Sequence, residues 1–250
     1  MNPRGSLRVQ LAATWCGPVC IGLYLVFWGI LGHNIPPPSP HYNATEIVAN
    51  YFGPHHLSIL IGMAGASAIG ILYLPWSASL CSIMRRKEHR VPVLGNIELL
   101  GGGITAWLLA ECAAMWAHAA HYGAANPMLS EMLWRQAWFI FDLTYMITTV
   151  QMVGAGIYAL IDKSQHPVFP RWAGWWAIAG GLSYVPLSLV AFITDGPLAW
   201  NGVWNFWVVW SFWVSWFAIY NRFMIRYLRN QLAGMGASAA TPSPAEPSLT

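Results

Sequence analysis

The sequence predicts an all-α protein, a bundle of six transmembrane helices with both termini in the cytoplasm. Charged residues make up only 8% of its 250 residues and apolar residues 56%, whereas a soluble domain carries about a quarter charged residues. The apolar residues fall into six long runs. Eleven of the twelve Lys and Arg residues lie in segments that share one side of a membrane if every run crosses it.

Each run is long enough to cross a bilayer, whose apolar core of about 30 Å needs roughly 20 helical residues. The first run is longer than the apolar stretch of a signal peptide and no small-residue cleavage site follows, so we expect it to stay as a helix. Pro75 and Pro186 interrupt the second and fifth runs. The predicted spans are residues 15–33, 57–80, 97–118, 135–161, 172–194 and 202–220.

The two prolines share a sequence pattern, Tyr-x-Pro-x-Ser, at 73–77 and at 184–188. Three spans separate the two copies, so they would run in opposite directions across the membrane. An inverted repeat of three plus three spans has this arrangement, and transporters often combine such repeats with broken helices.

Basic residues predict the orientation of the spans. Only Arg135 lies on the other side, together with six of the eight His residues. Because positively charged loops stay in the cytoplasm, we expect both termini there. The basic residues of the predicted cytoplasmic side are Arg4, Arg8, Arg85, Arg86, Lys87, Arg90, Lys163, Arg171, Arg222, Arg226 and Arg229.

Two segments outside the spans differ from the rest. The outer loop 34–54 is rich in proline, which favours an extended path, and residues 45–52 within it form a candidate interfacial helix. The C-terminal segment 231–250 is rich in Ala, Ser and Pro and cannot bury enough apolar surface to order itself. We therefore expect a single transmembrane domain, residues 1–230, and a disordered cytoplasmic tail.

Three acidic residues lie within predicted spans, where charge is costly and usually has a function: Glu98 toward the inner side, and Glu111 and Asp142 toward the outer side. Glu111 lies about two helical turns below His118 at the outer end of the third span, and Asp142 lies at a similar depth below Arg135. Consecutive antiparallel helices are normally neighbours, so we expect both carboxyl groups to face one cavity toward the outer side. Glu111, Asp142, His118 and Arg135 are the candidate catalytic residues; structural ion pairs between them are the alternative.

Aromatic and polar residues at this level are the candidate ligand-binding residues. Trp and Tyr faces stabilise cationic centres, although Trp also anchors helices at membrane interfaces and Asp before Gly-Pro also forms turns. The candidates are Trp107, Trp116, Trp138, Tyr145, Asp195, Asn201, Trp204 and Asn205.

Three kinds of function stay open. The first is binding of an apolar or amphipathic, lipid- or terpenoid-like molecule with acid–base chemistry of an isomerase or cyclase type. The second is a transporter or an accessory membrane subunit without catalysis. The third is a haem or transition-metal site, although no closed ligand motif is present and we predict no cofactor. The histidines for such a site would be His55, His56, His118 and His121.

Three segments carry a resemblance to a known family: LYLPW at 72–76, PVFPRW at 167–172 and GPLAWNG at 196–202. They resemble recurrent segments of a family of uncharacterised bacterial polytopic membrane proteins, over most of residues 42–220. The resemblance implies a bacterial inner-membrane location and no particular activity. A small helical bundle with two buried acids is also similar to the membrane-bound terpene cyclases. This similarity is an analogy of fold and involves no shared motif.

The expected partners follow from the same features. We expect the lipid bilayer and an apolar small molecule, with a homo-oligomer or a partner membrane subunit also open. Nucleic acid is not expected, because topology accounts for the basic residues. No nucleotide-binding or common hydrolase motif occurs in the sequence.

Overall fold

The computed structural model describes residues 2–86 and 92–240, with side chains as far as Met235. The described residues form helices and no strand, which confirms the all-α class. Lys87 and Arg90 of the predicted cytoplasmic loop lie outside the described residues, as do residues 241–250 of the predicted tail.

Three of the predicted spans are divided into shorter helices, whereas the helices Val93–Tyr122 and Val209–Ala240 are longer than predicted. The α-helices are α1 (Pro3–Tyr24), α2 (Ala44–Ile47), α3 (Gly53–Gly70), α4 (Tyr73–Arg85), α5 (Val93–Tyr122), α6 (Pro127–Leu143), α7 (Met146–Ile161), α8 (Arg171–Ser183) and α9 (Val209–Ala240). Wider π-helical turns form η1 (Leu25–Leu31), η2 (Val48–Phe52) and η4 (Val203–Val208), and a 3-10 helix forms η3 (Val185–Ala191).

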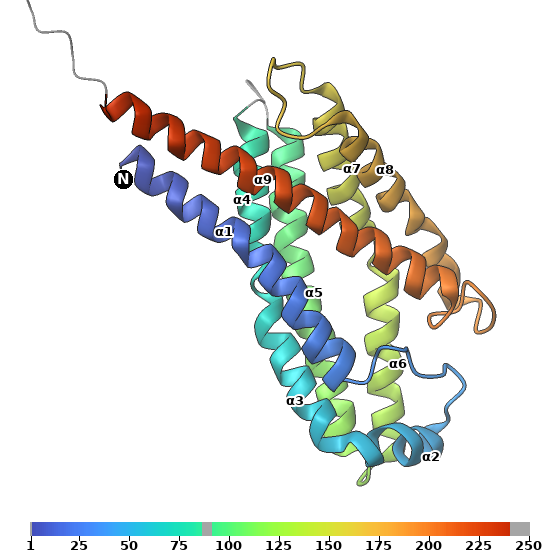
Figure 1. Cartoon of the computed structure of the whole chain (residues 1–250). Coiled ribbons are helices and arrows are strands. Elements are labelled where there is room, and N and C mark those ends of the chain that lie inside the picture. Colours follow the sequence, from blue (N-terminus) through green and yellow to red (C-terminus); the bar gives the residue numbers. More distant parts are fainter. Residues whose placement is uncertain (1, 87–91, 241–250) are drawn as a thin grey trace, which may run out of the picture.

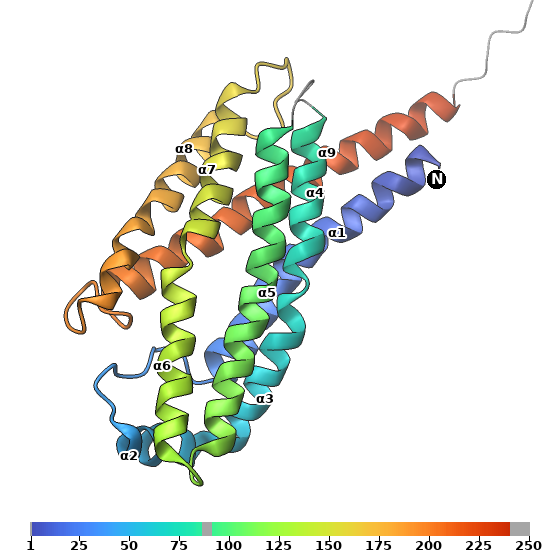
Figure 2. The ribbon, with the colours of Figure 1, turned by 180° about the vertical axis from the view of Figure 1, so that it is seen from behind.

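Helices α3 to α8 form the upright part of a bundle, and α1 and α9 cross one face of it at a slant (Figures 1 and 2). Helix α1 packs along α9 and α4, and α9 also packs on α8. The start of α1 and the end of α9 project together from one end of the bundle, whereas α2 lies at the other end, near the α5–α6 turn (Figure 1).

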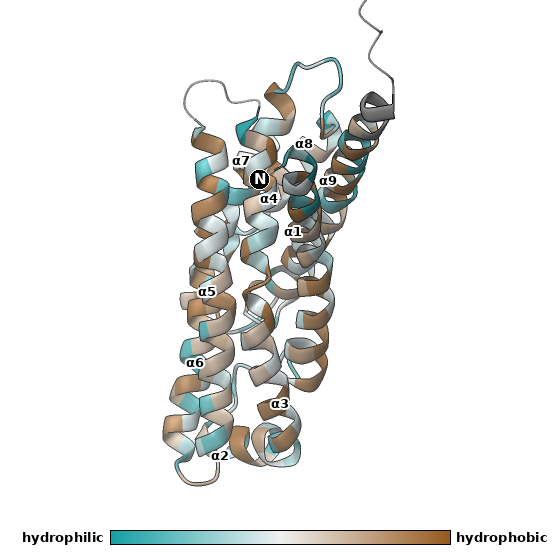
Figure 3. Cartoon of the chain, turned by 90° about the vertical axis from the view of Figure 1, so that its left-hand side faces the viewer, coloured by the Kyte–Doolittle hydropathy of each residue, from teal (hydrophilic) through white to brown (hydrophobic). Residues whose placement is uncertain are grey.

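Five helical stretches of the described chain are long and apolar enough to cross a membrane: Pro3–Leu31, Ala44–Arg85, Val93–Tyr122, Pro127–Ile161 and Arg171–Ala191. Apolar residues cover much of the length of the bundle (Figure 3). These are the properties of a multi-pass membrane protein.

The stretch from η4 through α9 is not among the five, and the predicted sixth span stays a prediction. Its apolar character comes largely from Trp, which has low hydropathy, and arginines follow from Arg222 onward. Helix α9 also continues to Ala240, past residue 231 where the sequence predicted that the tail begins.

Three of the stretches are broken between their ends. Helix α3 stops at Gly70 before α4, α6 stops at Leu143 before α7, and α8 gives way to η3 after Ser183. Proline lacks an N–H and its ring displaces the carbonyl four residues earlier. Pro75 and Pro186 therefore account for the first and third breaks, as the sequence predicted, whereas no proline marks the second.

Neighbouring side chains satisfy the backbone groups that the breaks release, as they must where no water is present. The Thr149 hydroxyl donates to the carbonyl of Gly181 (3.0 Å), and the Trp204 indole N–H donates to that of Ser183 (3.1 Å). Between α6 and α7, the Thr144 hydroxyl donates to the carbonyl of Ile140 (2.8 Å). The break after α8 and the break between α6 and α7 thus carry side-chain hydrogen bonds.

Candidate functional site

A cavity of about 60 Å³ lies where the broken helices meet. Tyr184, which follows α8, and Thr144 and Tyr145, which separate α6 from α7, all line it. Tyr73 at the start of α4 stacks on its wall residue Trp213, with ring centroids 6.3 Å apart. The lining consists of Thr105, Leu108, Leu109, Phe141, Asp142, Thr144, Tyr145, Thr148, Tyr184, Leu187, Asn205, Val209, Trp210 and Trp213.

Asp142 supplies the one carboxyl group among the residues that line this cavity. Its side chain is only 7% exposed, its Oδ2 is buried without a partner, and the carboxyl group makes no hydrogen bond or ion pair with any described residue. The residue lies near the middle of the Pro127–Ile161 stretch. The helix that carries it starts at Pro127 and not at Arg135, where the sequence predicted the start of the span.

Asn205 supplies a second buried oxygen that lacks a hydrogen-bond donor. It lies in the π-helical turn η4 and is 4% exposed. Its side-chain nitrogen donates to the carbonyl of Leu198 (2.6 Å), which leaves Oδ1 buried without a donor. The cavity thus contains two buried acceptor oxygens, on Asp142 and Asn205, that no described group satisfies.

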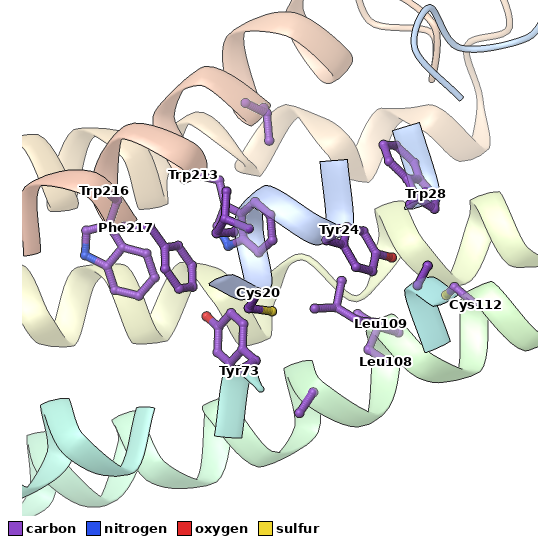
Figure 4. Close-up of a cluster of buried hydrophobic side chains, with 14 of the residues drawn as sticks. Cys20, Tyr24, Trp28, Tyr73, Leu108, Leu109, Cys112, Trp213, Trp216 and Phe217 are labelled. Carbon is purple, nitrogen blue, oxygen red and sulfur yellow. The ribbon is translucent and has the colours of Figure 1, made fainter. Parts of the chain in front are cut away.

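Aromatic rings form one wall of the cavity. The rings of Trp210 and Trp213 lie 5.3 Å apart, and Trp28 stacks on Trp210 with centroids 4.8 Å apart and planes 12° apart. Trp28 comes from η1 and also stacks on Phe206 of η4, with ring centroids 6.2 Å apart. Figure 4 shows Tyr24, Trp28 and Trp213 around Leu108 and Leu109 of α5.

A second buried polar cluster surrounds Glu98 on α5, which is 1% exposed. Its Oε1 accepts hydrogen bonds from the Ser77 hydroxyl (2.7 Å) and the Gln151 amide nitrogen (3.1 Å). The Gln151 amide oxygen accepts from the hydroxyls of Thr105 (3.0 Å) and Tyr73 (3.3 Å). Because Thr105 also lines the cavity, the Glu98 cluster (Tyr73, Ser77, Glu98, Thr105 and Gln151) adjoins the Asp142 cavity.

The structure places three of the predicted site residues in the cavity: Asp142, Tyr145 and Asn205. Glu111 is half-buried and is not part of the lining. On α5 the lining residues are Thr105, Leu108 and Leu109, and the lining ends before Glu111. Glu111 and Asp142 therefore do not share this cavity.

Arg135 does not bond to Asp142 either. Its guanidinium donates to the Glu131 carboxylate (2.8 Å) and to the carbonyls of Pro40 (3.0 Å) and Tyr42 (2.8 Å) in the outer loop. The arginine thus attaches that loop to α6.

The remaining candidates lie elsewhere. Asp195 forms an exposed ion pair with His41 (2.8 Å). Trp107 is 60% exposed on the outside of α5, and Asn201 is half-buried in the loop before η4. Trp204 supports the end of α8 as described above, while Trp116 and Trp138 are buried and pack against Trp28 beside the cavity. Burial of these Trp rings is a packing role that their sequence positions did not reveal.

The four outer histidines do not come together. His55 stacks on His33 (3.8 Å between ring centroids), His56 is exposed, and His118 and His121 both contact Tyr122. Within residues 2–86 and 92–240, no group of three or more His, Cys, Asp and Glu residues is arranged to hold a metal ion.

Sequence reasoning missed several residues of the two polar clusters, among them Thr105 and Thr148. A sequence pattern could have identified Tyr73 and Tyr184, because each is the first residue of a Tyr-x-Pro-x-Ser pattern. The serines of the pattern are also used: Ser77 bonds to Glu98, and Ser188 lies 2.6 Å from the Tyr145 hydroxyl. Both copies of the pattern thus contribute to the Asp142 cavity or the Glu98 cluster.

Comparisons of the chain with models of protein families, with curated proteins and with solved structures found no match. The family that the three quoted segments resemble stays a prediction.

Proposed function

We propose that this chain is an integral membrane protein that binds the amine head of a small amphipathic molecule at Asp142. In this proposal the chain crosses the bilayer six times with both termini in the cytoplasm, in accord with its basic residues. The resemblance described above favours a bacterial inner membrane.

The observation that carries the proposal is the pair of unsatisfied acceptors on Asp142 and Asn205. A buried carboxylate without a counter-charge is costly, so such a group takes up a proton or pairs with a cation. A protonated primary or secondary amine supplies both the positive charge and the N–H donors that the two oxygens lack. The faces of Trp210 and Trp213 add a favourable environment for a cation.

The size of the cavity limits what enters it. A space of about 60 Å³ holds a few water molecules or a group of similar size. An ammonium group is small enough, whereas a complete terpenoid or sterol body is not. The apolar part of the ligand would lie among lipid chains or require the helices to separate.

Transport is the second candidate function, because residues of two helix breaks, Thr144 and Tyr145 after α6 and Tyr184 after α8, line the cavity. Broken helices beside a central site are typical of secondary transporters. Acid–base catalysis by Asp142 together with Glu111 has less support, since Glu111 does not line the cavity.

Binding of n-hexylamine to the purified protein, followed by isothermal titration calorimetry, tests the proposal. We expect Asp142→Asn to weaken binding at least about tenfold, because the buried charge loses its partner. Glu111→Gln is the matched control, an acid on the adjoining helix outside the cavity, and should leave binding within about twofold.

n-Hexanol has the same alkyl chain without the charge. It should bind in the cavity of neither the wild-type protein nor Asp142→Asn. Equal binding of n-hexylamine by wild type and by folded Asp142→Asn would refute the proposal.

A further inference from the structure

We propose that Glu98 is a proton-exchanging site, and that Thr105 and Gln151 couple its protonation to the state of the Asp142 cavity. The exchange at Glu98 stands on its own contacts, whereas the coupling extends the function proposed above.

Glu98 is more deeply buried than Asp142 and also carries an unsatisfied oxygen. Its side chain is 1% exposed, and Oε2 has no hydrogen-bond partner. Neither of the two ion pairs formed by the described residues involves it. A carboxyl group in this setting must carry a proton or find a cation.

None of the described residues around Glu98 supplies such a cation. Helix α4 presents Tyr73 and Ser77, α7 presents Gln151, and α9 presents Tyr220, whose hydroxyl interacts electrostatically with Glu98. None of these groups is positively charged at neutral pH. A proton is therefore the counter-charge that the surroundings leave for Glu98.

The Ser77 and Gln151 donors also make the ionised state of Glu98 accessible. Both hydrogen bonds end on Oε1, which can accept them whether or not Oε2 carries a proton. The site can thus take up one proton on Oε2 and release the same proton, with no other bond formed or broken. Glu98 lies near the start of α5, toward the end of the bundle that carries Arg85, so exchange with water at that end is the shortest route.

The link to the cavity is direct. Gln151 bonds to Glu98 through its nitrogen and to Thr105 through its oxygen, and Thr105 lines the cavity that contains Asp142. A change of charge at Glu98 alters the hydrogen bonds that orient Gln151, and through it Thr105. Gln151 and Thr105 are positioning residues in this scheme.

Two glycines of α5 make room for this arrangement. A Cβ at Gly101 would overlap the side chain of Gln151, and one at Gly102 would overlap that of Ser77. The close approach of α4 and α7 to α5 at this level thus depends on glycine at both positions.

Infrared titration of the protonated carboxyl band in the purified protein tests the proposal without any ligand. Between about pH 5 and about pH 10 we expect a band that titrates and that Glu98→Gln removes. A Glu98 band that is absent, or that does not change over this range, would overturn proton exchange at Glu98.

Separate variants test the coupling between Glu98 and the Asp142 cavity. Thr105→Val, which keeps the shape and removes the hydroxyl, should shift the midpoint of the Glu98 band by about half a pH unit. Thr105→Ser should restore the wild-type midpoint, and Asp142→Asn should also shift it. Thr149→Val is the matched control, because that buried hydroxyl bonds to Gly181 outside both polar clusters.

The outcomes separate this inference from the proposed function. A Glu98 band that titrates but responds to neither Thr105→Val nor Asp142→Asn would overturn the coupling. If n-hexylamine does not bind while both shifts are observed, the proposed ligand class is wrong and the coupling of Glu98 to the cavity stands.

Discussion

At the scale of single residues, Arg135 illustrates how a charged side chain near a membrane surface can have a structural use. Its spacing from Asp142 suggested a catalytic or ion-pair partner. The proline-rich outer loop, however, has few backbone hydrogen bonds of its own, and its carbonyls at Pro40 and Tyr42 accept from the guanidinium. A planar group with five N–H donors suits this role, which helical spacing alone could not reveal.

His33 and His55 form the clearest pH-sensitive contact of the outer side. His33 lies just beyond η1 with a positive φ of 53°, and its ring stacks on that of His55 at 3.8 Å. Partial burial, and then the proximity of His55, lower the pKa of His33 below its ordinary value of 6.5. Two protonated rings at this distance would repel each other.

Acidification should therefore destabilise the folded protein through His33. Because the folded state binds the proton less readily than the unfolded state, this contribution to stability is complete above about pH 6.5 and is lost as the pH falls through the lowered pKa. We expect the unfolding temperature in detergent to drop between about pH 7.5 and about pH 5.

His33→Asn should reduce this drop, since Asn tolerates a positive φ and does not titrate. His118→Asn, at an exposed position, should leave it unchanged. An equal drop in wild type and His33→Asn would assign the effect to other groups.

At the scale of helices, close packing depends on small residues whose partners only the fold defines. Gly17 of α1 faces the ring of Trp76, which is fully buried and donates to Asn221 (3.1 Å). A Cβ at Gly17 would overlap this ring, which has no free space in which to move. Helix α1 can therefore cross α4 at this distance only with glycine at that position.

Gly17→Ala should lower the free energy of unfolding by about 1 to 3 kcal/mol, the usual cost of overpacking. Gly22→Ala is a matched control in the same helix, where a Cβ meets nothing within 4 Å; it should be neutral or stabilise by up to about 1 kcal/mol. Thermal unfolding of the two variants in one detergent measures the difference. Equal stabilities would show that α1 and α4 can separate without cost.

The helix breaks show which elements the sequence could predict. Pro75 and Pro186 mark two of them, because proline removes a helical hydrogen bond wherever it occurs. The break between α6 and α7 has no proline. At this break the Thr144 hydroxyl donates to the carbonyl of Ile140, a contact that Thr14 also makes within the unbroken helix α1.

At the scale of the whole molecule, the slanted pair α1 and α9 brings residues from both ends of the chain onto the α3–α8 bundle (Figure 2). Trp28 and Trp210 meet in this way, although η1 and α9 are far apart in sequence. The pairing also places Trp15 of α1 beside Arg222, Arg226 and Arg229 of α9, and the two helices run together to one end of the bundle (Figure 1). This end is the cytoplasmic one in the six-span arrangement.

Cysteine labelling from the two sides of the membrane tests that arrangement. Ala125→Cys lies in the exposed turn between α5 and α6, and Gln165→Cys in the exposed segment between α7 and α8. In intact cells a membrane-impermeant maleimide should label Ala125→Cys, and it should label Gln165→Cys only after the membrane is opened. The unsubstituted chain, whose four cysteines are half-buried or buried, is the control. Labelling of both positions in intact cells would contradict six spans with cytoplasmic termini.

The sequence by itself determined the all-α class, the long apolar helices, two of the three breaks, and Asp142, Tyr145 and Asn205 as site candidates. These follow from local composition and spacing, which depend on residues close together in the chain. Only the tertiary structure decided that Asp142 and Glu111 do not share a cavity, that Arg135 holds the outer loop, and that Glu98 adjoins the Asp142 cavity through Gln151 and Thr105. Those relations depend on helix rotation and on contacts between distant segments, which packing of the whole bundle sets.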